Sequence, residues 1–423
     1  MAPNVKETGF AEQFHLYVGF DWASAHHDVV AVDRAGQVVL ELTLPDTADG
    51  WDGLRQGLAG AAGGHLAGVA VAVETNNGPA VERLLDWGCA VYPLNPKAAQ
   101  RYRERKAPVG GKSDRLDAWS FADALRTDGH GWRRLTPDDP LTQELRLLCR
   151  DEVDLIRQRT ALVCALKQAL RLYYPAAVEA FEDWTLPGAW AFVEAFPTPA
   201  QLVQAGRRKQ EKFLHVHKLY RPETYQKRLE IFARADQFGG WPALTSAKSR
   251  LAVALAAQLR LLQKQLDQYR QAIAGLFARH PDHDVFGSLP LAHGKMGPRL
   301  LSEIGDDRGR FKQAEGLQCY AGSAPVTLQS GRYRRVRFRT GCNKHLRHAV
   351  HLWANLSRQK SAWAEAYYQH KRQQGMSHAC ALRCLAHRWL KIIWKMWQTR
   401  TRYDEALHTR NQVAHGSWIL KPA

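Results

Sequence analysis

The sequence lacks the cysteine patterns that define disulfide-rich and zinc-binding proteins. Only seven of its 423 residues are cysteine, and none forms a Cys-x-x-Cys pair. Neither a disulfide framework nor a tetrahedral zinc site is therefore predicted. Cys380 and Cys384 lie one helical turn apart, but without a second pair they are better interpreted as small buried hydrophobic residues.

Long apolar segments are also missing. No apolar run approaches the ~18 residues that a membrane-spanning helix needs, and the stretch from Met1 to Thr8 contains no hydrophobic core of a signal peptide. These absences predict a cytoplasmic protein that does not enter a membrane.

Acidic residues are scarce relative to basic ones. The chain carries 59 Lys and Arg against 41 Asp and Glu, a formal net charge of +18, while 45% of its residues are hydrophobic. That composition is typical of a soluble globular protein, and the length predicts two or three domains. Because Lys and Arg release counterions when they neutralise phosphates, the basic excess favours nucleic acid as the partner.

The N-terminal region, residues 14–138, alternates strand and helix patterns. Strands are predicted at residues 17–21, 27–33, 37–44, 67–74 and 89–92, with helices at 47–58 and after Asn77-Gly-Pro79. This order is that of an α/β RNase H-like (RuvC-like) domain. In that fold, acidic residues lie on the first strand, the fourth strand and a late helix.

Residues 139–282 are predicted to be a helical, coiled-coil region with an inserted segment at 175–240. Leu259, Leu262, Leu266, Tyr269, Ile273 and Leu276 follow the 3, 4 spacing of a coiled-coil seam. Two long helices flanking the insert are consistent with an antiparallel hairpin or with an arm that dimerises. Ordinary packing within the chain would produce the same pattern.

The C-terminal region, residues 283–405, is predicted to be mainly α-helical, and residues 406–423 form a tail. Gly294-Lys-Met-Gly-Pro298 before a helix is typical of half a helix-hairpin-helix, in which backbone amides approach a phosphate. A short basic strand follows it. From Arg332 to Arg347 there are seven Arg or Lys and no acid. Such a run is often only a solvated face, but its alternation between turns favours contact with phosphates.

Four carboxylates occupy the positions where catalysis is expected. Asp21 and Glu74 each end an apolar strand, and Asp114 and Asp117 lie three residues apart, on one face of a predicted helix. Hard cations prefer oxygen ligands, so these acids are predicted to bind Mg²⁺, or Mn²⁺ in its place. The neighbouring residues Lys112 and Arg115 would help to neutralise them.

Ser330 is the second candidate for chemistry. It precedes Gly331 and a strand rich in arginine. A hydroxyl needs a base, a metal or local charge to become a nucleophile. Because no His or Asp is adjacent, the residues alone are more typical of a turn than of a catalytic serine.

Together these motifs resemble a family of bacterial insertion-sequence transposases with a RuvC-like Asp-Glu-Asp-Asp domain, related to the Piv and MooV recombinases (the IS-one-ten group). The resemblance covers nearly the whole chain. It rests on the four acids with Lys112-Ser-Asp-Arg-Leu-Asp-Ala118, and on Ser302-Glu-Ile-Gly-Asp306, Tyr320-Ala-Gly-Ser-Ala-Pro325, Ser330-Gly331 and Thr340-Gly-Cys-Asn-Lys-His-Leu-Arg347.

The resemblance implies more than the residues show. It implies that Ser330 is the nucleophile, that donor and target DNA are substrates, and that a structured guide (bridge) RNA pairs with both. It also implies a dimer or tetramer in which the carboxylate domain of one subunit meets the serine domain of another. The basic residues expected to contact nucleic acid are Lys112, Arg332, Arg335, Arg337, Arg339, Lys344 and Arg347.

Two other functions fit the same sequence. A plain RuvC-like nuclease or junction resolvase would use water as its nucleophile, and Ser330 would be structural. A nucleic-acid-binding protein on an inactive scaffold would bind without cutting, although all four acids are present.

Overall fold

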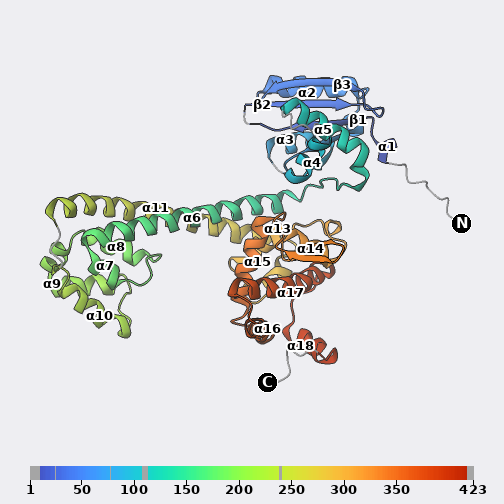
Figure 1. Ribbon diagram of the computed structural model, residues 1–423. Helices are drawn as coiled ribbons and strands as arrows, with labels where there is room; N and C mark the ends of the chain where they lie inside the picture. Colours follow the sequence, from blue (N-terminus) through green and yellow to red (C-terminus); the bar gives the residue numbers. More distant parts are fainter. Residues whose placement is uncertain (1–9, 24, 77, 107–112, 238–240, 417–423) are drawn as a thin grey trace. The chain divides into compact units, whose positions relative to one another are not determined.

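The computed structural model describes residues 10–23, 25–76, 78–106, 113–237 and 241–416. The chain divides into two compact units, Met1–Pro137 and Asp138–Ala423 (Figure 1). The helical region and the C-terminal region of the sequence both fall within the second unit. Among the described residues, no helix is both long enough and apolar enough to cross a bilayer.

The first unit is built on a five-stranded mixed sheet with the strand order β3-β2-β1-β4-β5. The strands are β1 (Leu16–Asp21), β2 (His26–Val32), β3 (Val38–Pro45), β4 (Val69–Val73) and β5 (Ala90–Pro93). Strands β1 to β3 pair antiparallel, while β4 is parallel to both β1 and β5. This is the arrangement of an RNase H-like domain, as the alternation of patterns predicts.

Helices cover both faces of this sheet. They are α1 (Phe10–Gln13), α2 (Ala48–Ala61), α3 (Pro79–Asp86), α4 (Pro96–Lys106) and α5 (Asp114–Asp128). Side chains alternate between the two faces of a strand. Val69, Val71 and Val73 therefore pack in the core beneath α2 and α3, and Ala70 and Ala72 pack in the opposite core with α4 and α5.

The absence of a side chain at Gly19 sets the position of α5. A Cβ at this residue would lie 1.7 Å from the carbonyl oxygen of Ala118, so helix and strand meet backbone to backbone. Only glycine permits so close an approach. Since α5 begins with Asp114 and β1 ends with Asp21, this contact fixes two acidic segments against each other.

In the second unit, two long helices pack against each other: α6 (Pro140–Tyr173) and α11 (Pro242–Arg279). Between them in sequence lie α7 (Pro175–Ala180), α8 (Pro187–Ala195), α9 (Pro199–Val216) and α10 (Pro222–Ala233). These shorter helices share an aromatic-rich core with the last turns of α6 and the first half of α11. Five of the six heptad residues of α11 are buried within one chain, as in the hairpin interpretation, and Tyr269 is half-buried.

The other ends of α6 and α11 join a second helical core. It contains α12 (His283–Gly287), α13 (Met296–Ile304), α14 (Ala314–Tyr320), α15 (Lys344–Ser357), α16 (Ala362–Gln373) and α17 (His378–Thr399). Four tryptophans fill its centre: Trp353, Trp363, Trp389 and Trp397. A hairpin of β6 (Val326–Ser330) and β7 (Tyr333–Arg337) and a last helix, α18 (Glu405–Ala414), complete the unit.

Candidate active site

Two of the predicted acids lie at the same edge of the sheet. Asp21 is the last residue of β1, and Glu74 immediately follows β4. The two strands are parallel neighbours, with Phe20 opposite Val73. Asp21 and Glu74, which follow this pair in the sequence, therefore lie at the same edge of the sheet, and both are half-buried there.

Helix α5 brings the other two acids to this edge. Ser113 caps the helix, with its hydroxyl accepting a hydrogen bond from the amide of Leu116 at 3.2 Å. Asp114 is exposed in the first turn, and Asp117 is buried three residues later. One carboxylate oxygen each from Asp21, Asp114 and Asp117 lie within 4.8 Å of one another.

The carboxylates repel one another in this cluster. Burial, together with the negative charges of Asp117, Asp114, Glu74 and Asp28, raises the pKa of Asp21 to about 7. Asp21 therefore responds electrostatically to all three other predicted acids. A carboxylate that keeps a proton near neutral pH indicates an excess of negative charge in the site. A divalent cation would neutralise that excess.

The neutralising cation in the described part of this site differs from the one expected. Arg103 of α4 forms an ion pair with Asp117. Arg115 instead points to β3, where its guanidinium donates to Glu41 with a second contact of 2.9 Å. The expectation that Arg115 neutralises the acids is wrong, because the carboxylate of Glu41 competes for it. Lys112 lies outside the described residues.

Sequence reasoning missed two residues beside the site. His26 and Asp28 of β2 have ligand atoms within 4.8 Å of each other and of Asp114. In the β1–β2 pairing, Asp28 is directly opposite Asp21, so both side chains lie on one face of the sheet. The sequence signal was the hairpin register, which places the start of the second strand opposite the end of the first.

The donor set fits a hard divalent cation. Asp21, Asp114 and Asp117 offer carboxylate oxygens, with Glu74 close enough to raise the pKa of Asp21. Mg²⁺ is bound by one or two such carboxylates, waters and substrate phosphates, in preference to closed protein cages. Asp21, Glu74 and Asp114 are at least partly open to solvent, which leaves room for the substrate.

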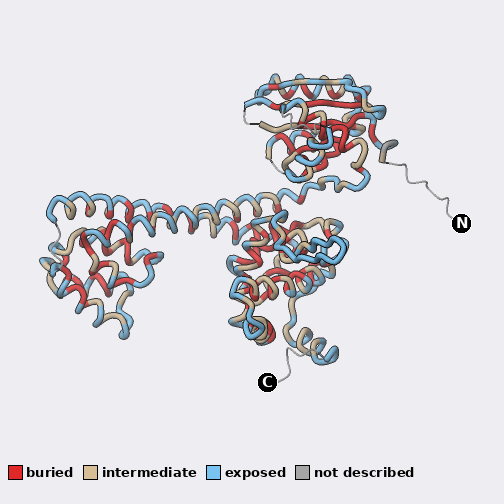
Figure 2. The backbone as a smooth tube through the Cα atoms, viewed as in Figure 1, coloured by how far each residue is buried: buried red, intermediate tan, exposed pale blue. Residues whose placement is uncertain are grey.

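Ser330 lies on an exposed hairpin in the second unit. It is the last residue of β6 and pairs with Tyr333 across a two-residue turn, Gly331-Arg332. Gly331 has a φ of +55°, which glycine readily adopts at such turns. Apart from the half-buried Val326, the hairpin is exposed (Figure 2). In the described part of the chain, no hydrogen bond joins Ser330 to a histidine or a carboxylate.

The strand arginines lie partly as the alternation predicts. Arg335 and Arg337 are paired with Leu328 and Val326, so they share the face of Ser330. Val336 and Phe338 are 58% and 45% exposed, so the opposite face does not pack into a core. The hairpin therefore presents two open faces, with cations and the serine on one of them.

The remaining basic candidates are dispersed around this hairpin. Arg339 lies beyond the end of β7, and its Nε donates to the carbonyl of Ala324 at 3.1 Å. Arg347 lies 5.0 Å from the ring centre of Phe338. Arg332 is exposed in the turn, and Lys344 is exposed in the first turn of α15.

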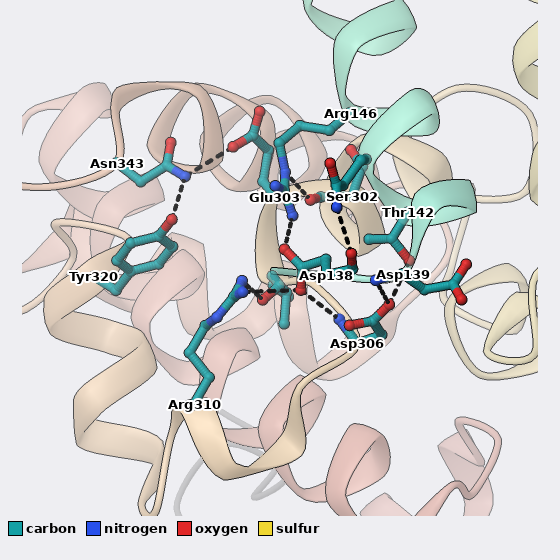
Figure 3. Close-up of polar contacts among 12 residues, drawn as sticks. Asp138, Asp139, Thr142, Arg146, Ser302, Glu303, Asp306, Arg310, Tyr320 and Asn343 are labelled. Atoms are coloured by element: carbon teal, nitrogen blue, oxygen red, sulfur yellow. Dashed lines mark hydrogen bonds and ion pairs between the residues drawn. The ribbon is translucent and has the colours of Figure 1, made fainter. Parts of the chain in front are cut away.

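A buried polar network supports the start of α15 (Figure 3). Asn343 caps this helix and donates from Nδ2 to Glu303 at 2.8 Å and to the hydroxyl of Tyr320 at 2.9 Å. Asp306 accepts from the amide of Asp139 and the hydroxyl of Thr142, at 2.8 and 2.9 Å. The short motifs that contain Glu303, Tyr320 and Asn343 thus meet at the start of α15, and Asp306 holds the start of α6.

The Gly-rich turn before α13 differs from the expected phosphate-binding turn. Gly297 and Pro298 are buried inside the first turn of the helix. The amide of Gly297 already donates to the carbonyl of Ala292 at 2.6 Å. That amide is therefore not available to a phosphate, because the carbonyl of Ala292, in the turn between α12 and α13, already accepts from it.

An RNase H-like sheet with these acids at one edge, on a chain with a basic, mainly helical second unit, defines a DEDD-type nucleic-acid-processing protein. Residues 18–175 match the model of the DEDD domain described as "Transposase". Residues 285–369 match the model described as "Transposase IS116/IS110/IS902 family".

Curated relatives agree with these matches. The "Mini-circle putative transposase for IS117" of Streptomyces coelicolor is 35% identical over 397 residues, covering 92% of this chain and 95% of the relative. The "Insertion element IS110 uncharacterized 43.6 kDa protein" of the same organism is 27% identical, covering 95% and 99%. The chain therefore belongs to the IS116/IS110/IS902 family of transposases and is an insertion-sequence transposase that acts on DNA.

Proposed function

We propose that this transposase is a site-specific recombinase that cuts and exchanges DNA strands through a covalent link to Ser330. In this mechanism Asp21, Glu74, Asp114 and Asp117 hold Mg²⁺, or Mn²⁺ in its place. The observation that carries the proposal is the convergence of Asp21, Asp114 and Asp117 at one sheet edge of a DEDD-type domain.

The acids support phosphodiester chemistry through the cation that they would bind. Such an ion supplies charge stabilisation for the phosphate oxygens and lowers the pKa of an oxygen that it binds. The role of the protein is to hold the carboxylates in place. Gly19 does so by letting α5 approach β1, and Arg103 does so by pairing with Asp117.

The hairpin supports the assignment of Ser330 as nucleophile. Its hydroxyl is exposed beside the glycine of a tight turn, and Arg335 and Arg337 on the same face would hold the phosphate oxygens. The serine oxygen forms a bond to phosphorus, and the bond from phosphorus to the leaving strand oxygen breaks. The serine proton passes to that leaving oxygen, which becomes a hydroxyl. Religation reverses these steps on the exchanged strand.

The proposal also includes the nucleic-acid partners of the protein and its oligomeric state. The partners are donor and target DNA and a structured guide RNA that pairs with both, so that base pairing reads the sequence and the basic residues hold the backbones. The functional form is a homo-oligomer, a dimer or tetramer. In it the carboxylate domain (residues 14–138) of one subunit acts with the serine domain (residues 283–405) of another.

The competing function is a metal-dependent nuclease or junction resolvase that uses water. It is favoured by one observation: within the described residues, no histidine or carboxylate hydrogen-bonds to Ser330, whereas the acids already form a cluster. The two functions differ in whether protein becomes attached to DNA.

A covalent-trap experiment decides between them. The protein, the RNA encoded beside its element and labelled DNA carrying the element junction are mixed with Mg²⁺ and run on a denaturing gel, with and without protease. We expect a protease-sensitive shifted band that Ser330→Ala and Asp114→Asn both abolish. Thr327→Ala is the matched control, because it removes an exposed hydroxyl from the opposite face of the same hairpin. Cleavage without a shifted band, unchanged in Ser330→Ala, would establish the nuclease.

A further inference from the structure

A cavity of about 240 Å³ lies where α6, α13 and α15 meet. Helix α13 packs against both of the other helices (Figure 1). The cationic and imidazole side chains that line the cavity are Arg150, Arg157, Arg299, Lys344, His345 and His348. The volume is below the ~300–1,000 Å³ that holds a drug-sized ligand, so it suits a small group such as a phosphate.

Two arginines of the cavity are held rigidly by buried carboxylates. Arg150 donates to both oxygens of Glu303, at 2.7 and 2.9 Å. Arg299 donates to Glu152 at 2.7 Å. Burial alone would raise the pKa of Glu303, but hydrogen bonds from Arg150 and Asn343 hold that pKa below its ordinary value. The carboxylates thus stay ionised and fix the guanidinium groups without filling the cavity.

The cavity keeps an excess of positive charge. Its lining contains three arginines and one lysine against a single carboxylate, Glu303. Glu152 and Asp154 pair with Arg299 and Arg157 from outside the lining, and the second of these pairs is largely exposed. Lys344, at the rim, has no ion-pair partner among the residues that the structure describes.

The pKa values of the ionisable groups around the cavity are lowered, in part by this positive charge. Burial, followed by the charge of Arg150, lowers the pKa of His345. His348 is exposed, but desolvation by the surrounding atoms, followed by the charge of Arg299, lowers its pKa. The pKa of Lys295, in the turn before α13, is lowered by burial and by nearby arginines that include Arg270 and Arg299. Each of these groups is harder to protonate, first because it is desolvated and second because positive charge is nearby.

Arg299 also carries a donor that lacks an acceptor. The residue is 8% exposed, and its Nε is buried with no hydrogen-bond partner. Leaving such a donor without an acceptor destabilises the folded state, and more so when the group is charged. A bound anion with several acceptor oxygens would supply the missing acceptor after a small movement of the side chain.

We propose that this cavity binds a backbone phosphate of nucleic acid, held by Lys344 and His348 at its rim and by the arginines behind them. The site is separate from the exposed arginine hairpin, and it depends only on the nucleic-acid substrate of the family, not on the serine step. It anchors a strand on the side of the helical core where α6 begins.

The test measures binding by the full-length protein over a series of salt concentrations. Duplex DNA carrying the element junction and the RNA encoded beside the element are used in separate arms. Lys344→Ala/His348→Ala is compared with Lys360→Ala, which removes an exposed lysine from the turn between α15 and α16. Both altered side chains of the double variant are exposed, so its melting midpoint should match that of the control.

We expect the double variant to bind about tenfold more weakly near 0.15 M salt, with a salt slope lower by about 1, while Lys360→Ala stays close to wild type. If the double variant loses affinity and salt slope for the DNA, the phosphate belongs to DNA. If it loses them for the RNA, the phosphate belongs to RNA. Equal slopes for the double variant and the control in both arms would overturn the site. Because binding is measured without cleavage, this result is independent of whether a serine adduct forms.

Discussion

At the scale of single residues, the acids of the DEDD-type domain show the clearest link from sequence to position in the fold. Asp21 and Glu74 could be predicted because each ends an apolar strand, where a solvated charge is not expected. Arg103 could not be predicted as a neighbour of the site, because its position depends on how α4 packs on α5. His26 and Asp28 could have been found from the register of the β1–β2 hairpin, which places the start of β2 opposite the end of β1.

The raised pKa of Asp21 gives a prediction with a defined sign. The folded protein binds a proton near pH 7, whereas the unfolded chain binds it near the ordinary value of 3.8. Ionised Asp21 therefore destabilises the metal-free fold fully above about pH 7, and the destabilisation fades as the pH falls toward 4. In chelator at pH 8, Asp21→Asn should raise the free energy of unfolding by about 1–2 kcal/mol once solvent screening is allowed for, and the melting midpoint should rise with it. The gain at pH 5 should be much smaller.

Thermal melts of the wild type and of Asp21→Asn at the two pH values check this prediction. The control is Asp52→Asn, which changes an exposed acid of α2. At pH 8, millimolar Mg²⁺ should place the melting midpoint of the wild type above that of Asp21→Asn, since only the wild type gains stability from the ion. Identical midpoints for wild type and Asp21→Asn in chelator at pH 8 would contradict the account of a repulsive carboxylate cluster.

At the scale of elements, the contact between β1 and α5 determines whether the site exists. Gly19→Ala would place a methyl group 1.7 Å from the carbonyl of Ala118 and force the helix away from the strand. We expect a loss of about 3 kcal/mol or more in unfolding free energy, together with loss of the Mg²⁺-dependent rise in midpoint. Denaturant unfolding with and without Mg²⁺ measures both effects.

The matched control for this change is Gly53→Ala. Gly53 is exposed on α2 and an added Cβ would meet nothing within 4 Å, so this substitution should stabilise the domain by about 0.5–1 kcal/mol. A Gly19→Ala protein that keeps both its stability and its response to Mg²⁺ would show that the close approach does not position the acids.

Elements were predicted best where periodicity is strong. The five strands of the sheet and both long helices lie within a few residues of the predicted ranges, because burial on one or both faces imposes a clear pattern. The turn at Gly294–Pro298 was predicted less well. Its sequence is compatible with a phosphate-binding loop, and only the hydrogen bond to the carbonyl of Ala292 shows that the amide of Gly297 is already used. The phosphate cavity combines α6, α13 and α15, which no local pattern could relate.

At the scale of the whole molecule, the proposed assembly predicts complementation between inactive subunits. If the carboxylate domain of one subunit acts with Ser330 of another, a mixture of Asp114→Asn and Ser330→Ala proteins contains some sites with both intact parts. The mixture should recover a measurable fraction of wild-type recombination, although neither variant alone is active. Recombination of junction DNA by co-refolded or co-expressed variants, at fixed total protein, checks this. No recovery in the mixture, with both variants binding DNA normally, would place both parts of each site in one subunit.

The most direct test of the central claim is mass spectrometry of the trapped complex. Wild-type protein reacted with junction DNA, guide RNA and Mg²⁺ would be digested with nuclease and protease, and the peptide spanning β6 and β7 would be sequenced. The account predicts a nucleotide phosphate on Ser330, absent when Asp114→Asn replaces the wild type. Cleaved DNA with an unmodified Ser330 peptide, or with the phosphate on another residue, would contradict it.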